Sequence, residues 1–230
     1  MMNEKPILFS AEMVKAILEG RKTQTRRVLK KQPIDILPMK LPNMWVTWET
    51  RNPSHGRVIR CRYGVPGDRL WVRETWAHDD MDCKDIRCGN RDHIWWKANE
   101  TKIVADSFAG DAHWRPSIHM PRWASRINLE IVKVRVERLQ NISRDDAMFE
   151  GVEVVNPYKI DPNLPPGFPA AFRDYTNPDN FFTADPIASF RSLWGSVNSG
   201  RKAEDFAAFQ WNSNPWVWVI EFKKVVRHEP

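Results

Sequence analysis

The chain is poor in cysteine and contains no long uninterrupted hydrophobic stretch. Its 230 residues include three cysteines, an odd and low number that provides no disulfide framework and is typical of a reducing compartment. The longest strongly apolar segment, Trp216–Ile220, is far too short to span a bilayer. The first 22 residues carry three glutamates and do not resemble a signal peptide. We therefore expect a cytoplasmic protein that does not associate with membranes.

Metal-binding motifs are equally scarce. Cys83, Cys88 and His93 are close in the sequence, but no second cysteine pair follows them. The common structural zinc sites draw their ligands from two such groups. We therefore expect neither a metal ion nor another cofactor.

Tryptophan and positive charge are abundant instead. The chain has 12 tryptophans and a formal net charge of +6. Tryptophan gathers in cores, clefts and interfaces, and a basic surplus favours anionic partners. Residues 117–126 interleave the two kinds of side chain, with Arg122 next to Trp123, a mixture that suits stacking on bases while arginine holds phosphate. The alternative is that most of these tryptophans pack beneath surface loops.

The hydrophobic pattern predicts a single domain, residues 1–230, that mixes strands with a few helices. Helices are expected at residues 11–19, 144–150 and 184–194, and strands at 68–76, 127–139 and 216–222. Within the second strand the alternation changes phase at Val132, which predicts a β-bulge. Long strands with few helices favour an α+β fold built on a small β-barrel with flanking helices. Two proline-rich segments, at about 32–56 and 156–186, are predicted to be irregular, and the second is typical of a long loop or an insertion.

The segment Gly20–Arg27 follows the first helix and concentrates positive charge around a lysine and a threonine. One interpretation is purely electrostatic, because cations stabilise the negative end of a helix. Neighbouring cations also disfavour a charged ammonium group, so Arg21, Arg26 and Arg27 are expected to lower the pKa of Lys22. A neutral lysine beside a hydroxyl is one way to activate a nucleophile, here Thr25.

Two glutamates are further candidates for chemistry. Glu150 closes the second expected helix just before Gly151, where the helix dipole opposes negative charge, and this placement suits it to carrying a proton. The alternative is an ordinary solvated glutamate. Glu74 shares the inward face of its strand while Arg73 points the other way. This carboxylate is expected either to pair with an arginine or to line a cleft.

Together these segments resemble a known family. The run Gly-Arg-Lys-Thr-x-Thr-x-Arg at Gly20–Arg27 is similar to the signature of ASCH domains, a branch of the PUA-like β-barrel superfamily. The segments Gly64–Val72 and Trp218–Phe222 resemble the Gly-Asp turn with its barrel strand and the closing strand of that family. The resemblance covers both ends and the core strands, and it implies insertions at about 32–56, 77–116 and 156–186, which the small members of the family lack. In length the chain resembles the longer, prophage-type members.

The resemblance implies an amidohydrolase. Small bacterial members of the family hydrolyse N(4)-acetylcytidine with a lysine, a threonine and a glutamate, which fall here on Lys22, Thr25 and Glu150. The reaction implied is metal-free: the lysine takes the proton of the threonine, whose oxygen attacks the acetyl carbonyl, and the glutamate returns a proton to the leaving amine. Arg21 or Arg26 would then stabilise the oxyanion or hold a ribose or phosphate.

Two other functions stay open at this stage. PUA-like barrels are chiefly readers of RNA and of bases, so the chain is alternatively a non-catalytic nucleic-acid-binding module that reads a modified base. Arg73, Glu74, Arg122 and Trp123 are the predicted contact residues beyond the catalytic set. A third interpretation is an accessory prophage protein that acts through protein contacts. The lysine, threonine and glutamate favour the enzyme, whereas the basic and tryptophan-rich insertions favour the binder.

Overall fold

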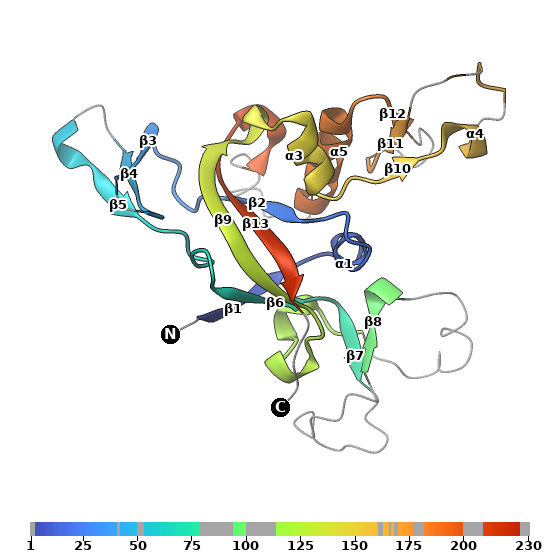
Figure 1. The fold of residues 1–230 in the computed structure, drawn as a ribbon, viewed down its shortest axis with the longest axis horizontal. Helices are drawn as coiled ribbons and strands as arrows, with labels where there is room; N and C mark the ends of the chain where they lie inside the picture. Colours follow the sequence, from blue (N-terminus) through green and yellow to red (C-terminus); the bar gives the residue numbers. More distant parts are fainter. Residues whose placement is uncertain are drawn as a thin grey trace.

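A five-stranded sheet forms the centre of the molecule (Figure 1). The computed structural model describes residues 3–40, 42–49, 53–78, 94–99, 114–160, 163–165, 167, 170–176, 182–199 and 209–225. In sheet order the central strands are β1 (Glu4–Leu8), β6 (Arg69–Arg73), β9 (Asn128–Arg138), β13 (Trp216–Val225) and β2 (Gln24–Val28). β1 and β6 are parallel, and the other neighbours are antiparallel. Within the described residues the edge strands β1 and β2 do not pair with each other, so these residues form an open sheet and not the closed barrel that the sequence predicted.

β9 and β13 are the longest described strands and run side by side through the sheet (Figure 1). Their register shifts where Glu221 pairs with Lys133 but Phe222 pairs with Ile131, which leaves Val132 as an extra residue in β9. Ile131 is buried, whereas Val132 is exposed. The phase change in the sequence therefore predicted this bulge correctly. Such an extra residue bends the strand and increases its twist.

Alternate residues of β13 divide the core in two. Trp218 and Ile220 join a cluster on the face that α1 (Ala11–Leu18) covers. Val217 and Val219 join a second cluster, on the face covered by α3 (Arg144–Phe149) and α5 (Pro186–Asn198). All four side chains are buried. Because both faces of the strand are covered, its sequence is an almost continuous apolar run.

The helix signals in the sequence are confirmed at the N-termini. Ser10 caps α1 and Ser143 caps α3, each accepting a hydrogen bond from the backbone N–H three residues later. Gly20 and Gly151 follow these helices with positive φ values of 78° and 89°, a conformation that glycine adopts without strain. α5 continues to Asn198, beyond the expected end near residue 194.

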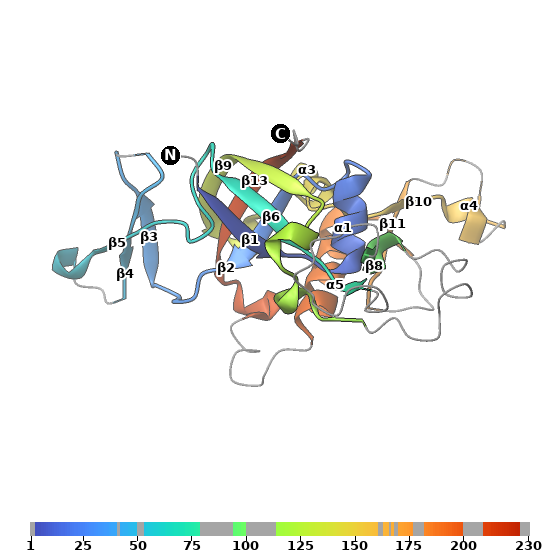
Figure 2. The ribbon, with the colours of Figure 1, turned by 90° about the horizontal axis from the view of Figure 1, so that it is seen from below.

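Each predicted insertion adds a small sheet at the periphery of the molecule (Figures 1 and 2). The first supplies β3 (Asp35–Pro38) and β4 (Trp45–Trp48), which pair with each other, and β4 also pairs with β5 (Arg57–Ile59). The second pairs β7 (Trp76–His78) with β8 (Ile94–Trp96). The third supplies α4 (Pro157–Ile160), β11 (Ala171–Arg173) and β12 (Phe182–Thr183), next to β10 (Val154–Val155). Short 3-10 turns are η1 (Pro53–His55), η2 (Lys97–Asn99), η3 (Ser117–His119), η4 (Arg122–Ala124), η5 (Leu139–Asn141) and η6 (Trp211–Ser213).

The described residues thus form a mixed α+β fold that is mostly strand, with few helices. No helix in this described part of the chain is long and apolar enough to cross a membrane.

Candidate active site

A buried ion pair joins the turn after α1 to the end of α3. The Nζ atom of Lys22 donates to Oε2 of Glu150 at 2.8 Å and to the backbone oxygen of the same residue at 2.8 Å. The two side chains are only 0% and 2% exposed. The two residues also form an isolated antiparallel β-bridge, so the backbone itself holds them together.

Gly151 permits this close approach. A Cβ atom at this position would lie 2.8 Å from the Cβ of Lys22 and 3.0 Å from the Cβ of Ala16. Real Cβ atoms essentially never come within 3.0 Å of another atom, so any other residue would force Lys22 or its neighbours to shift. The carbonyl oxygen of Gly151 also accepts a hydrogen bond of 2.7 Å from Arg21, whose guanidinium is further bound by an exposed glutamate.

Arg26 holds the other oxygen of Glu150. Its Nη1 atom donates to Oε1 of Glu150 at 3.1 Å, and its Nη2 atom donates to Asp146 at 3.0 Å and to Glu137. The guanidinium is fully shielded from solvent and stabilises three carboxylates at once. Its Nε atom is buried and has no hydrogen-bond partner within the described residues.

The charged network extends from Arg26 to the surface through Asp146 and Arg135. Arg135 donates to Asp146 at 2.8 Å and also binds Glu137 and Glu221. Burial acts to raise the pKa of Asp146, but the hydrogen bond from Gln24 and the nearby guanidinium groups outweigh it and hold the pKa below its usual value. Asp146 is therefore ionised and anchors the far end of Arg26.

The pKa of Lys22 is lowered from its ordinary value of 10.5. Burial is the main cause, because it disfavours the charged ammonium group. The charge and hydrogen bond of Glu150 oppose this shift, and the charges of Arg27 and Arg26 add to it. The sequence predicted the direction from neighbouring cations, including Arg26, but the leading cause is the burial that the tertiary structure creates.

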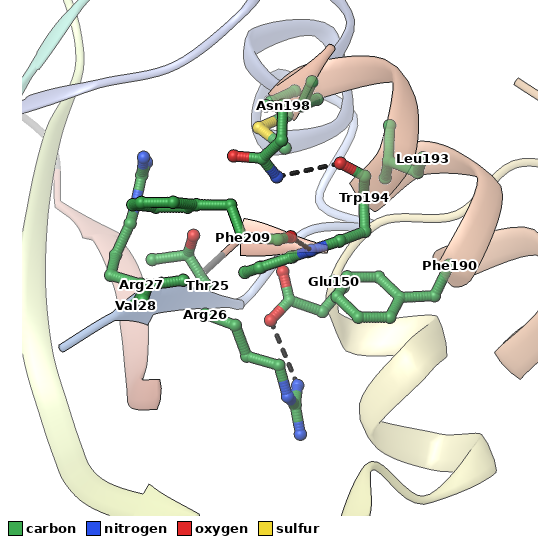
Figure 3. Close-up of a pocket in the computed structure, with 12 residues that line it drawn as sticks. Thr25, Arg26, Arg27, Val28, Glu150, Phe190, Leu193, Trp194, Asn198 and Phe209 are labelled. Atoms are coloured by element: carbon green, nitrogen blue, oxygen red, sulfur yellow. Dashed lines mark hydrogen bonds and ion pairs between the residues drawn. The ribbon is translucent and has the colours of Figure 1, made fainter. Parts of the chain in front are cut away.

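Thr25 and Glu150 line one small cavity between β2 and α5, with a volume of about 40 Å³. Figure 3 shows the two side chains pointing into the same space, next to Trp194 and Phe209. Thr25 is 2% exposed, and its hydroxyl makes no hydrogen bond that we find within the described ranges. The structure therefore brings a hydroxyl and a carboxylate together, with Lys22 bound to that carboxylate.

α5 forms the opposite wall of the cavity. It contributes Phe190, Leu193, Trp194 and Asn198, of which the ring of Trp194 is fixed by a hydrogen bond of 2.6 Å from its Nε1 atom to the backbone oxygen of Phe209. No role was predicted for these residues from the sequence. Counted from Phe190, the other three residues lie three, four and eight positions along the helix, a spacing that places all four on one helix face.

Glu74 belongs to a separate ion pair. Both of its oxygens accept hydrogen bonds of 2.9 Å from Arg126, whose guanidinium lies 4.7 Å from the ring centre of Trp96. Burial raises the pKa of Glu74, and Arg126 only partly offsets that shift. The sequence left open whether Glu74 pairs with an arginine or lines a cleft, and in the structure it pairs with Arg126. Glu74 does not line the cavity at Thr25.

The remaining predicted contact residues are engaged within the molecule. Arg73 and Arg122 lie over Trp71, with 4.8 Å and 5.7 Å between guanidinium carbon and ring centre. Arg122 also makes a two-point hydrogen bond to Glu4, at 2.6 Å and 2.9 Å. Trp123 packs edgewise against a buried tryptophan. These residues lie apart from the described lining of the Thr25 cavity.

Cys83, Cys88 and His93 lie outside the described residues. Among the residues that the structure does describe, no group of three or more histidine, cysteine, aspartate or glutamate side chains is arranged to hold a metal ion.

No family model, curated protein or solved structure matches this chain. The resemblance to ASCH domains therefore stays a prediction from the sequence segments quoted above.

Proposed function

We propose that this protein is a metal-free amidohydrolase that removes the acyl group from an acylated cytosine nucleoside such as N(4)-acetylcytidine. One observation carries the proposal: Thr25 and Glu150 line the same cavity, and Lys22 binds the carboxylate of Glu150 at 2.8 Å. A hydroxyl, a carboxylate and an amine of lowered pKa form a path along which a proton can move. The ASCH resemblance supplies the substrate class.

The reaction has two steps. In the first, the Thr25 oxygen attacks the acyl carbonyl, its proton passes through the Glu150 carboxylate to neutral Lys22, and the carbon–nitrogen bond breaks as that proton returns to the exocyclic amine. Cytidine leaves, and the acyl group is held as an ester on Thr25. In the second step a water molecule attacks the ester, its proton returns to the threonine oxygen by the same path, and the carboxylic acid is released.

Arg26 has two roles in this mechanism. Through Nη1 it positions Glu150, while Asp146 and Glu137 hold it from the other side. We also assign to Arg26 the stabilisation of the oxyanion formed on the acyl carbonyl: its Nε donor has no partner among the described residues, but it is shielded and must turn toward the cavity when the substrate binds. Arg21 is already bound to Gly151 and an exposed glutamate, so we assign the oxyanion to Arg26 alone.

We also infer a finer fold from the resemblance, a PUA-like core of the ASCH kind in which the peripheral sheets are insertions. The positions of the matching segments support it. Gly20–Arg27 runs from the end of α1 into β2, and Trp218–Phe222 lies in β13, directly paired with β2. In that pairing Ile220 lies opposite Thr25, so the two segments meet at the proposed nucleophile.

The test is the release of cytidine from N(4)-acetylcytidine by the purified full-length protein. Thr25→Val keeps the shape of the side chain but removes its hydroxyl, and we expect a loss of about 100-fold or more in kcat/KM. The matched control is Thr47→Val. Thr47 is also buried, but it lies in a peripheral sheet, where its hydroxyl donates a hydrogen bond of 3.1 Å to the backbone oxygen of Arg57. This control is expected to keep the wild-type rate.

Two outcomes would overturn the proposal. One is a well-folded wild type that releases no cytidine, and the other is a Thr25→Val variant as active as wild type. In the first case the same protein should be tested as a non-catalytic nucleic-acid-binding module. The measurement is how its affinity for RNA and DNA depends on salt concentration. The structure gives less support to that function, because Arg122 and Arg126 already bind carboxylates within the molecule.

A further inference from the structure

The cavity at Thr25 is much smaller than a nucleoside. Its volume is about 40 Å³, whereas sites that enclose a drug-sized ligand occupy about 300–1,000 Å³. A buried water needs about 10–15 Å³ of such space, so the cavity has room for about three water-sized groups. An acetyl group, with its methyl, its carbonyl carbon and its oxygen, matches this space.

The chemistry of the lining also suits a short acyl group. Val28 from β2 and Leu193 from α5 offer apolar contacts to a methyl group. Thr25, which also lines the cavity, supplies the nucleophile, and the positive charge of Arg26, another lining residue, favours the carbonyl oxygen. An apolar lining with a few convergent polar groups is the usual composition of a small-molecule site.

The wall opposite Thr25 is held firmly in place. The Trp194 ring is fixed by its 2.6 Å hydrogen bond to Phe209, and its backbone oxygen accepts a bond of 2.8 Å from Asn198. Phe190 packs against it with 6.0 Å between ring centres and is itself buried. Enlarging the cavity on this side would break these contacts, so we expect the wall to resist a larger group.

We propose that this cavity is the acyl subsite, and that the α5 wall, with Leu193 as its main determinant, restricts the enzyme to short N-acyl groups such as acetyl. The nucleoside itself stays outside the cavity. The inference rests on the proposed function and adds the substrate's acyl class to it. Each methylene beyond acetyl then meets a wall that cannot yield, and discrimination by one methylene in a fitted pocket is typically about 10-fold or more.

The experiment measures kcat/KM for the N(4)-acetyl, N(4)-propionyl and N(4)-butyryl derivatives of cytidine. For wild type we expect a fall of about 100-fold or more from acetyl to butyryl, about 10-fold for each added methylene. Leu193→Ala removes buried side-chain volume from the wall, and we expect it to reduce that ratio at least about 5-fold. The matched control is Ile187→Ala, which shortens a partly buried residue of the same helix that does not line the cavity. Its acyl ratio should equal that of wild type.

The outcomes separate the two proposals. Equal rates on all three compounds, or an unchanged ratio in a folded Leu193→Ala variant, overturn the acyl subsite and leave the hydrolase intact. No release from any of them overturns the hydrolase and the subsite together. If Leu193→Ala does not fold, Leu193→Met replaces it, since it changes the shape of the wall at similar volume. The acyl ratio must then differ from wild type, and an unchanged ratio again refutes the subsite.

Discussion

The Nζ atom of Lys22 and the Oε2 atom of Glu150 lie 2.8 Å apart, with both side chains shielded from solvent. Burying two charges is costly, and their attraction compensates only while both partners are present. Arg26 binds the second oxygen of Glu150, so the carboxylate stays paired when Lys22 is removed, whereas Lys22 has no such second carboxylate in the described network. The pair is therefore asymmetric, which leads to a first prediction.

Removing Glu150 should destabilise the protein more than removing Lys22. For Glu150→Leu we expect a loss of about 3–5 kcal/mol in the free energy of unfolding, because a buried ammonium is left without its partner. Lys22→Met should cost less. In urea denaturation, the double variant Lys22→Met/Glu150→Leu should lose less free energy of unfolding than the sum of the losses in the two single variants. Additive losses within about 0.5 kcal/mol would contradict a coupled pair.

Gly151 and Gly20 offer a matched pair of substitutions, since both have positive φ. A Cβ at Gly20 meets no atom within 4 Å, so Gly20→Ala should cost only the backbone strain of about 1–2 kcal/mol. Gly151→Ala adds the contact with the Cβ of Lys22 and should cost clearly more, and it should also lower hydrolysis. Thermal unfolding and the cytidine assay measure the two effects. Equal losses in both variants would show that the close contact does not matter.

The rate of hydrolysis should rise with pH. The mechanism needs neutral Lys22, and the lowered pKa of this residue brings the rising limb of kcat/KM below pH 10.5. Arg27 contributes to that lowering, so Arg27→Gln should raise the pKa of Lys22 and move the limb to higher pH. Arg57→Gln, in the peripheral sheet, removes the same charge far from the site and should leave the limb in place. A limb that moves downward in Arg27→Gln would refute this role of Lys22.

Glu74 should make the free energy of unfolding fall as the pH rises above 4.5. Burial raises its pKa above the ordinary 4.5, so the folded state binds a proton more tightly than the unfolded chain does. The contribution of Glu74 is fully present below pH 4.5 and is lost as the pH rises through the raised value. Wild type should therefore lose stability relative to Glu74→Gln over that range in urea denaturation at several pH values. A constant difference between the two proteins would count against this pKa shift.

The local signals in the sequence predicted much of the framework. Ser10 and Ser143 marked the two helix starts, because a cap acts on N–H groups only three residues away. The phase change at Val132 located the bulge, since a strand alternates residue by residue. Strand parity also placed Glu74 on the inward face, where it is buried. Each of these features depends on a few neighbouring residues.

The candidate site depends on tertiary structure more than the helices and strands of the framework do. Its three candidate residues stand out in the sequence, but Lys22 and Glu150 are 128 positions apart, and no local pattern shows that they share a hydrogen bond. The α5 wall and the anchoring of Arg26 by Asp146 likewise depend on how helices pack on the sheet. Burial, which is the main cause of the lowered pKa of Lys22, exists only once distant segments exclude water from it. The sequence determined which groups are present and on which face of their element they lie, and long-range packing decided which of them meet.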